Sequence, residues 1–374
     1  MNHRAVLPGL YVHVPFCLKK CHYCNFVITT DRSNDMRQQF FAALEREINY
    51  SRGRYGRLKF ETLYFGGGTP SALTAAETLK VFELLRNAFD FANGAEVTWE
   101  VNPGDVDAEK IAVYRAAGVT RISLGIQSFQ EASLRDMGRP HGLAEIRQTM
   151  QALRSEGFKN ISVDLILRLP GETLEHVRHN LESALALEPA QFSLYDLEVH
   201  AATVYGARAA RGELKQISES EHEAVTEFAE QRLEKAGYIQ YALGAFARPG
   251  FESRHNLNYW HNGAYLGLGP GAFGYMEGVR YQHAPDVQRW IGKCLRADWK
   301  PETEDVLTPA QKELETLLTG LRLKEGISPG DFSEDTKEKI RPLVERKLLA
   351  QESGRIALTQ RGRFLAESVF AALV

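Results

Sequence analysis

Short apolar runs alternate with amphipathic segments through the first two thirds of the chain. Six runs rich in β-branched or aromatic residues predict strands that begin near residues 11, 62, 97, 121, 161 and 192. Helical periodicity marks segments between them, including 36–50, 75–89 and 174–187. A strand followed by a helix, repeated about six times, predicts parallel βα units. Because the runs are apolar on both faces, we expect a parallel sheet buried on both sides.

The alternation fades after a predicted helix that ends near Ala236. Residues 237–300 are rich in glycine and aromatic residues and show no clear periodicity. A capping box with proline at the first helical position then begins a helix at Thr308, and a second helix is predicted from Asp335. A hairpin at Ser353-Gly354 and a last helix from Phe364 complete a winged-helix-like order. We therefore predict three parts: an α/β open barrel at 1–236, an extension at 237–300 and a C-terminal domain at 301–374.

Composition narrows the class of protein. The chain has 374 residues, 44% hydrophobic and 25% charged, which is typical of a globular protein with a large core. Its net charge of −3 gives no general attraction for nucleic acid or an anionic membrane. No apolar run reaches the roughly 20 residues of a membrane span, and the N-terminus lacks the apolar core of a signal peptide. We expect a cytoplasmic protein with no nucleic-acid partner and no membrane span.

A winged helix also occurs in DNA-binding proteins, so the charge of the C-terminal part matters. Residues 301–374 contain 11 Lys and Arg against 13 Asp and Glu, a net charge of −2. A DNA-binding module should instead carry a basic face. We interpret this part as a packing or lid module, with DNA binding as the minor alternative.

Three of the four cysteines fall within eight residues of the sequence YVHVPFCLKKCHYCNF. Cys17, Cys21 and Cys24 follow the first predicted strand, where a parallel barrel places its chemistry. Thiols at this spacing can hold one compact cluster, and a [4Fe-4S] cubane with three protein ligands leaves one iron open. Zinc is the alternative, with His22 or Cys294 as fourth ligand, but structural zinc usually takes two ligand pairs. We predict the cluster and expect Cys294 to be a buried small hydrophobic residue.

At these cysteines the sequence resembles the radical-SAM superfamily, whose signature is CxxxCxxC. It more closely resembles the group that contains oxygen-independent coproporphyrinogen dehydrogenase and the HemW-type haem chaperones, through the YVHVPFC segment and the C-terminal module. The resemblance implies a partial (β/α)6 radical-SAM barrel with a winged-helix-like C-terminal domain. It also implies that S-adenosylmethionine (SAM) binds at the open iron.

The same resemblance implies which residues contact SAM. By order and local motif, the matching positions are Gly67, Gly68, Thr69, Glu100, Gln127, Arg139 and Asp164. Tyr11 matches a tyrosine associated with the site, and we include Tyr23 from the cysteine loop. Taken singly, each residue is more often structural. Asp164, a charge inside an apolar strand, is either paired structurally or used on a ligand.

Two features distinguish the members of this group. The dehydrogenase has another cysteine where this sequence has Phe26, and a longer extension before its tyrosine. The segment HNLNYW resembles the HNxxYW motif of the HemW-type chaperones, which implies haem contact by residues among His255, Asn256, Tyr259 and Trp260. Imidazole is a common axial ligand of haem iron, and aromatic rings can pack on the macrocycle. An isolated histidine would instead be a structural residue of an aromatic loop, with its hydrogen bonds made inside the protein.

The sequence departs from the family pattern at two positions. Phe273 stands where the family often has histidine, and Arg168 stands where it commonly has a smaller residue.

The leading hypothesis is a haem chaperone that binds haem, a [4Fe-4S] cluster and SAM and transfers haem to an acceptor haemoprotein. In this hypothesis the cluster and SAM gate transfer or formation of a homodimer. The alternative is a radical-SAM enzyme that abstracts a hydrogen atom from a tetrapyrrole, with the cofactor supplying the chemistry. A zinc-bearing DNA-binding protein is a third hypothesis, which ligand spacing and charge disfavour.

Overall fold

The computed structural model describes residues 7–330 and 332–374. Residues 1–6 lie outside the described residues. They begin the N-terminal segment in which the sequence predicts no signal peptide. The fold is built on a twelve-stranded sheet in the order β12-β11-β10-β9-β1-β2-β3-β4-β5-β6-β8-β7. Its centre consists of six parallel strands: β1 (Gly9–Val14), β2 (Lys59–Gly67), β3 (Asp90–Val101), β4 (Arg121–Gln127), β5 (Ile161–Leu167) and β6 (Gln191–Asp196).

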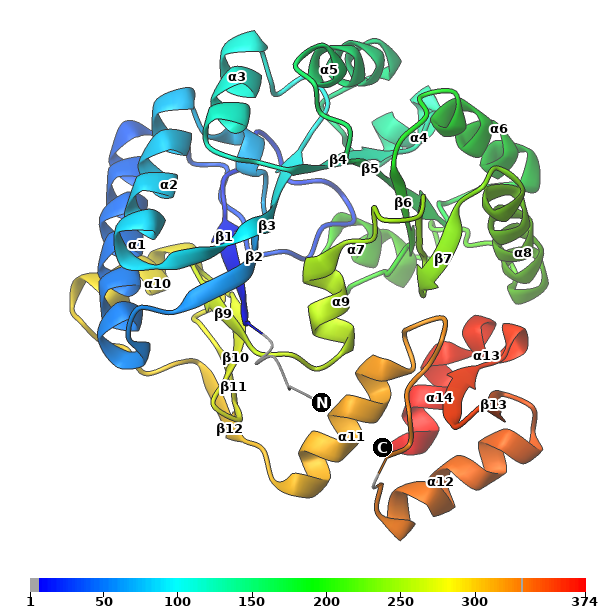
Figure 1. The fold of residues 1–374 in the computed structure, drawn as a ribbon. Coiled ribbons are helices and arrows are strands. Elements are labelled where there is room, and N and C mark those ends of the chain that lie inside the picture. Colours follow the sequence, from blue (N-terminus) through cyan, green and yellow to red (C-terminus); the bar gives the residue numbers. More distant parts are fainter. Residues whose placement is uncertain (1–6, 331) are drawn as a thin grey trace.

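Helices connect the parallel strands and lie outside the curved sheet (Figure 1). They are α1 (Asn34–Tyr55), the short 3-10 helix η1 (Pro70–Ala72), α2 (Ala75–Ala88), α3 (Ala108–Ala116), α4 (Glu131–Asp136), α5 (Leu143–Ser155) and α6 (Leu174–Leu185). Local sequence sets where they begin. Thr74, for example, forms a capping box with Glu77 at the start of α2. The predicted alternation of strands and helices is confirmed.

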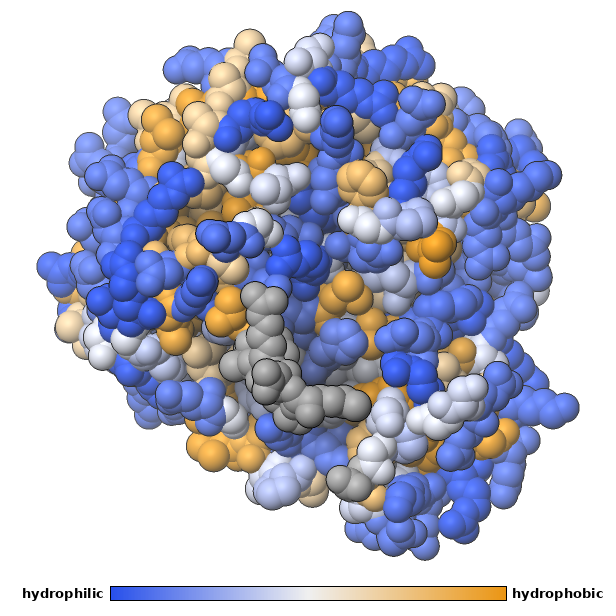
Figure 2. Space-filling model, in the orientation of Figure 1, coloured by the Kyte–Doolittle hydropathy of each residue, from blue (hydrophilic) through white to orange (hydrophobic). Residues whose placement is uncertain are grey.

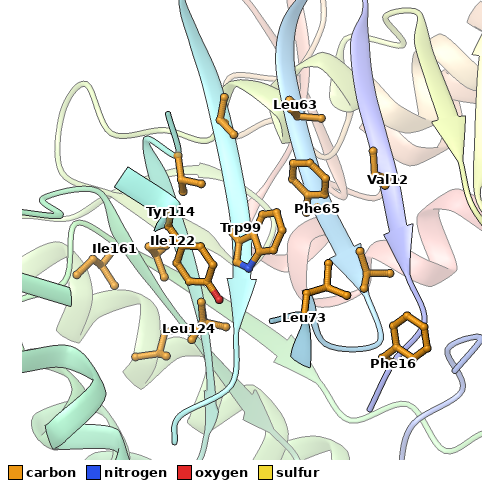
Figure 3. Close-up of a cluster of buried hydrophobic side chains, with 14 of the residues drawn as sticks. Val12, Phe16, Leu63, Phe65, Leu73, Trp99, Tyr114, Ile122, Leu124 and Ile161 are labelled. Atoms are coloured by element: carbon orange, nitrogen blue, oxygen red, sulfur yellow. The ribbon is translucent and has the colours of Figure 1, made fainter. Parts of the chain in front are cut away.

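Side chains alternate between the two faces of the parallel strands. Figure 3 shows the outer, apolar face, where Trp99 packs between Phe65 and Tyr114 at centroid distances of 4.4 and 5.2 Å. The inner face is polar and places Glu100 and Asp164 in a cavity. The expected burial of the parallel strands on both sides is confirmed, for example in β4 and β5. The expectation that both faces are apolar was wrong, because the inside of this barrel holds a polar cavity.

The segment after β6 completes the sheet at both edges. It contains α7 (Val204–Ala210), α8 (Glu219–Lys235), β7 (Ile239–Ala242), β8 (Ala245–Ala247), α9 (Arg254–Trp260), β9 (Tyr265–Leu268), β10 (Phe273–Met276), β11 (Val279–Gln282), α10 (Val287–Leu295) and β12 (Thr303–Val306). β1 pairs with β9 and β6 pairs with β8, so the six parallel strands form a partial barrel, as predicted. Residues 237–300 thus supply strands to the same sheet as the barrel, and the proposed boundaries at 237 and 301 remain predictions.

The C-terminal elements have a hydrophobic core of their own. They are α11 (Pro309–Gly320), α12 (Glu334–Glu345), β13 (Leu349–Glu352), β14 (Arg355–Leu358), α13 (Gln360–Phe364) and α14 (Ala366–Leu373), in the predicted winged-helix-like order. They pack near α8 of the barrel, where Arg363 pairs with Glu230 at 3.3 Å (Figure 1).

Figure 2 shows polar residues over most of the face drawn, with apolar residues scattered in small groups. Among the described residues, no helix is long and apolar enough to cross a membrane.

Candidate functional site

A cavity of about 410 Å³ opens at the carboxyl ends of the parallel strands. It brings together nearly all the residues predicted for the cluster and SAM, namely Cys17, Cys21, Cys24, Tyr23, Gly67, Gly68, Thr69, Glu100, Gln127, Arg139 and Asp164. Their separation along the chain reflects the βα topology, which returns each strand end to the same edge of the sheet. The predicted site is therefore one contiguous place in the fold.

The cysteine loop is held by backbone hydrogen bonds at its start and near its middle. The Cys17 N–H donates to the Thr29 carbonyl at 3.0 Å, and the His22 N–H donates to the Met137 carbonyl at 2.9 Å. Burial is the main cause that raises the pKa of Cys17 to about 11, and it also raises the pKa of Cys24. Metal binding would replace the protons of these thiols.

A single zinc ion and a cluster need different arrangements of donors. A zinc ion needs ligands that converge on one point at 2.0–2.3 Å. Within 7–330 and 332–374, no three His, Cys, Asp or Glu side chains form such a group. In a cubane each thiolate binds a different iron, so its thiols lie further apart while sharing one cavity. The three cysteines line one cavity, as the ligands of a single cluster would.

Two glycines shape the wall of the cavity beside this loop. Gly67 has a φ of 111°, and a Cβ there would lie 2.5 Å from the His13 ring. A Cβ on Gly68 would lie 2.7 Å from the Pro15 backbone. The strand end and the cysteine loop are therefore in close contact, which only glycine permits.

Two carboxylates lie on the inner face of the barrel. Glu100 accepts a hydrogen bond from the Tyr64 hydroxyl at 2.8 Å, and Asp164 accepts bonds from Ser123 at 3.0 and 3.2 Å. Burial raises the pKa of Glu100 to about 7, with the charge of Asp164 adding to the effect. Burial also raises the pKa of Asp164. Asp164 is thus both paired structurally and exposed to the cavity, so the two interpretations of this residue are compatible.

Gln127 and Tyr11 occupy different environments. Gln127 lies in the cavity wall with a φ of 71°, at an irregularity in the pairing of β4 with β5. A left-handed conformation in a non-glycine residue is strained, and such strain is often found at functional sites. Tyr11 is not among the cavity-lining residues: its hydroxyl contacts His13 at 3.1 Å and its ring stacks on Tyr64 at 6.1 Å.

The HNLNYW segment forms α9, away from the cavity, near the amino ends of the parallel strands. His255 is fully buried, and its two ring nitrogens lie 2.7 Å from the Thr62 hydroxyl and 2.8 Å from the Tyr259 hydroxyl. Burial is the main cause that lowers its pKa to about 3. The Arg322 guanidinium carbon lies over the Trp260 ring, 5.2 Å from its centroid. The Asn256 N–H donates a hydrogen bond to the Ser253 hydroxyl at the start of α9. The structure thus does not bring these four residues to the cluster cavity.

Several polar residues of the cavity were not predicted from the sequence. They are Asn102, Ser123, Tyr195, Asp196, Glu198 and His200. Asn102 follows β3 directly, and Ser123 lies on the same inner face as Glu100. Alternation along β3 from Glu100 could have identified Asn102, whereas Ser123 on β4 and Tyr195 on β6 depend on the register between strands.

Comparison with known proteins identifies the family. Residues 11–184 match the Radical SAM superfamily, and residues 307–365 match the HemN C-terminal domain. The Heme chaperone HemW of Lactococcus lactis subsp. lactis (strain IL1403) is 35% identical over 370 residues, covering 96% of this chain and 95% of that protein. The Heme chaperone HemW of Bacillus subtilis (strain 168) is 32% identical over 378 residues, covering 98% of this chain and 99% of that protein.

A solved structure agrees at the level of the fold. Coproporphyrinogen III oxidase (HemN) from Escherichia coli, described as a radical SAM enzyme, matches with a TM-score of 0.84 over 100% of this chain and 91% of that chain. The two sequences are 22% identical, so this match supports the fold alone. The full-length relatives carry the closer assignment: this chain belongs to the HemW family of the radical-SAM superfamily.

Proposed function

We propose that this protein is a haem chaperone that binds haem, a [4Fe-4S] cluster and SAM and transfers haem to an acceptor haemoprotein. The observation that carries the proposal is its similarity, over nearly the whole chain, to proteins named Heme chaperone HemW. Membership of the radical-SAM superfamily implies the cluster and SAM. The shared cavity supports both, because it gathers three thiols and the predicted SAM residues.

The residues of the cavity fit these cofactors. Cys17, Cys21 and Cys24 would hold the cluster, which supplies redox chemistry and an open iron when bound. Glu100 offers a carboxylate to ribose hydroxyls or an ammonium group once it is ionised, above a pKa of about 7. The backbone of Gly68 can approach a ligand closely, since no side chain intervenes.

The position of haem is a separate proposal. Leu18 and Phe26 line the cavity, yet their side chains are 55% and 66% exposed, which supports an apolar ligand at its mouth. Haem contact through HNLNYW remains a prediction. For His255 to bind iron, its ring would first have to release Thr62 or Tyr259.

The test starts from protein that is purified and reconstituted anaerobically. Iron and sulfide analysis should show one cluster, and zinc without iron or sulfide would refute the proposed site. Haem titration should then give binding, while coproporphyrinogen III should remain unoxidised in the presence of SAM and a reductant. Oxidation of coproporphyrinogen III would contradict the chaperone and favour the enzyme.

The second candidate is a radical-SAM enzyme that acts on a tetrapyrrole. It is favoured by one observation, that the predicted SAM residues of the cavity converge as catalysis would need. An assay for 5′-deoxyadenosine separates the two, since substrate-dependent formation would support the enzyme. The homodimer and the cytoplasmic location also remain predictions.

A further inference from the structure

A chain of hydrogen bonds joins two of the three cluster cysteines. Thr69, between β2 and η1, lies against Cys17, with 3.4 Å between the hydroxyl oxygen and the sulfur. Asn102, just after β3, donates its amide N–H to the Thr69 hydroxyl at 3.0 Å. The side-chain oxygen of Asn102 accepts a hydrogen bond from the Arg139 guanidinium at 2.6 Å. Arg139 also donates a hydrogen bond to the Cys21 sulfur at 3.5 Å.

The direction of these bonds follows from the chemistry of the groups. Because the Thr69 oxygen already accepts from Asn102, the hydroxyl proton is free to point at Cys17. A cysteine that binds iron is a thiolate without a proton, so it can only accept. The guanidinium of Arg139 can only donate. Both ends of the chain therefore direct hydrogen-bond donors at cluster sulfurs.

The surroundings hold this chain in place. The Asn102 backbone N–H donates to the Ser71 hydroxyl at 3.1 Å, and Arg139 also donates to the Gly125 carbonyl at 2.7 Å. A Cβ on Gly125 would lie 3.3 Å from the side-chain amide oxygen of Asn102. This glycine therefore leaves room for the contact between Asn102 and Arg139. An asparagine suits the position because it offers one acceptor and one donor.

We infer that Asn102 is a positioning residue for two of the three cluster thiolates. It sets the Thr69 hydroxyl toward Cys17 and the Arg139 guanidinium toward Cys21. Hydrogen bonds to cluster sulfurs and nearby charge set the reduction potential of an iron–sulfur centre, and donors stabilise the more negative, reduced state. Asn102 therefore raises the potential of the cluster, a role that rests on the cluster binding in the proposed function.

The test is a redox titration of the reconstituted protein without SAM, followed by electron paramagnetic resonance. Thr69→Val removes one hydroxyl and should lower the midpoint potential, while Thr69→Ser keeps the hydroxyl and should restore it. Asn102→Leu should lower the potential further, because both connections are lost. We expect on the order of a tenfold fall in the ratio of reduced to oxidised cluster at fixed solution potential, about 59 mV for one electron.

The control is Thr98→Val on β3, which makes the same change outside the cavity lining, at a buried hydroxyl with no hydrogen-bond partner among the described residues, and should leave the potential unchanged. Full cluster content with unshifted potentials in Thr69→Val and Asn102→Leu would overturn the inference. If Asn102→Leu holds no cluster, the comparison of Thr69→Val with Thr69→Ser still decides, because equal potentials would refute the role. If the unsubstituted chain binds no cluster, the proposed function itself fails.

Discussion

At the scale of single residues, Glu100 has a proposed binding role that opposes stability. Burial raises its pKa from 4.5 to about 7, so a folded chain above pH 7 holds a carboxylate that is costly to bury. The unfolded chain releases this proton earlier, and the stability contributed by the protonated group is lost as pH rises from 4.5 through 7.

We therefore predict that Glu100→Gln stabilises the cluster-free protein at pH 8, by roughly 1–3 kcal/mol, and has little effect at pH 4. Urea unfolding at the two pH values measures the difference. The same substitution should weaken SAM binding to the reconstituted protein. An equal effect on stability at both pH values would show that the carboxylate is not buried in this way.

His255 is the residue whose predicted role differs most from its environment. Its ring is fully buried and bonded at both nitrogens. His255→Ala should therefore lower the free energy of unfolding by roughly 2–4 kcal/mol even without haem. The substitution opens a cavity and removes the hydrogen-bond partner of the Thr62 and Tyr259 hydroxyls. Asn256→Ala, on the next residue of α9, is the control and should cost less than about 1 kcal/mol. A cost for His255→Ala as small as that of the control would contradict the described packing.

At the scale of elements, the contact between the end of β2 and the cysteine loop organises the site. Gly68→Ala would place a Cβ 2.7 Å from the Pro15 backbone, which must then shift and move the loop that carries Cys17. We predict that this variant takes up less than half of the normal iron and sulfide on reconstitution. Gly53→Ala in α1 meets no atom within 4 Å and should retain full uptake. Full uptake by Gly68→Ala would show that the loop does not depend on this contact.

The sequence predicted some elements better than others, for physical reasons. The parallel strands and the cysteine loop were readable because their signals are local: hydrophobic runs and close thiol spacing. The polar inner face was missed because an inward Glu100 next to an outward Trp99 looks like a mostly apolar run unless the barrel cavity is known. The place of α9 depends on long-range bonds to Thr62 on β2 and Glu96 on β3, which no local pattern reveals.

At the scale of the whole molecule, buried titratable groups predict how stability depends on pH. Burial is the main cause that lowers the pKa of His13 and His141 to about 4 and of His255 to about 3. These neutral histidines contribute stability above about pH 6.5, which is lost as pH falls. Glu100 and Glu172, whose pKa values burial raises to about 7, act in the opposite direction as pH rises.

Between pH 4.5 and 6.5 the three histidines outweigh the two carboxyl groups, so the thermal midpoint of the cluster-free protein should rise to a maximum near pH 6.5. It should fall slightly as both carboxyl groups lose their protons and change little above about pH 7.5. Calorimetry across pH 4.5 to 8.5 measures it. The acid limb should be shallower in a His141→Gln variant, which cannot take up the proton. A midpoint that rises steadily toward pH 4.5 would contradict the burial of these histidines.

A haem chaperone must bind haem and release it unchanged. The most direct measurement is an anaerobic absorbance titration of the cluster-loaded chain with haem, in the presence of SAM. The chaperone predicts saturable binding and release of the intact haem when an apo-haemoprotein is added. The absence of saturable binding, or chemical conversion of the bound tetrapyrrole, would contradict it.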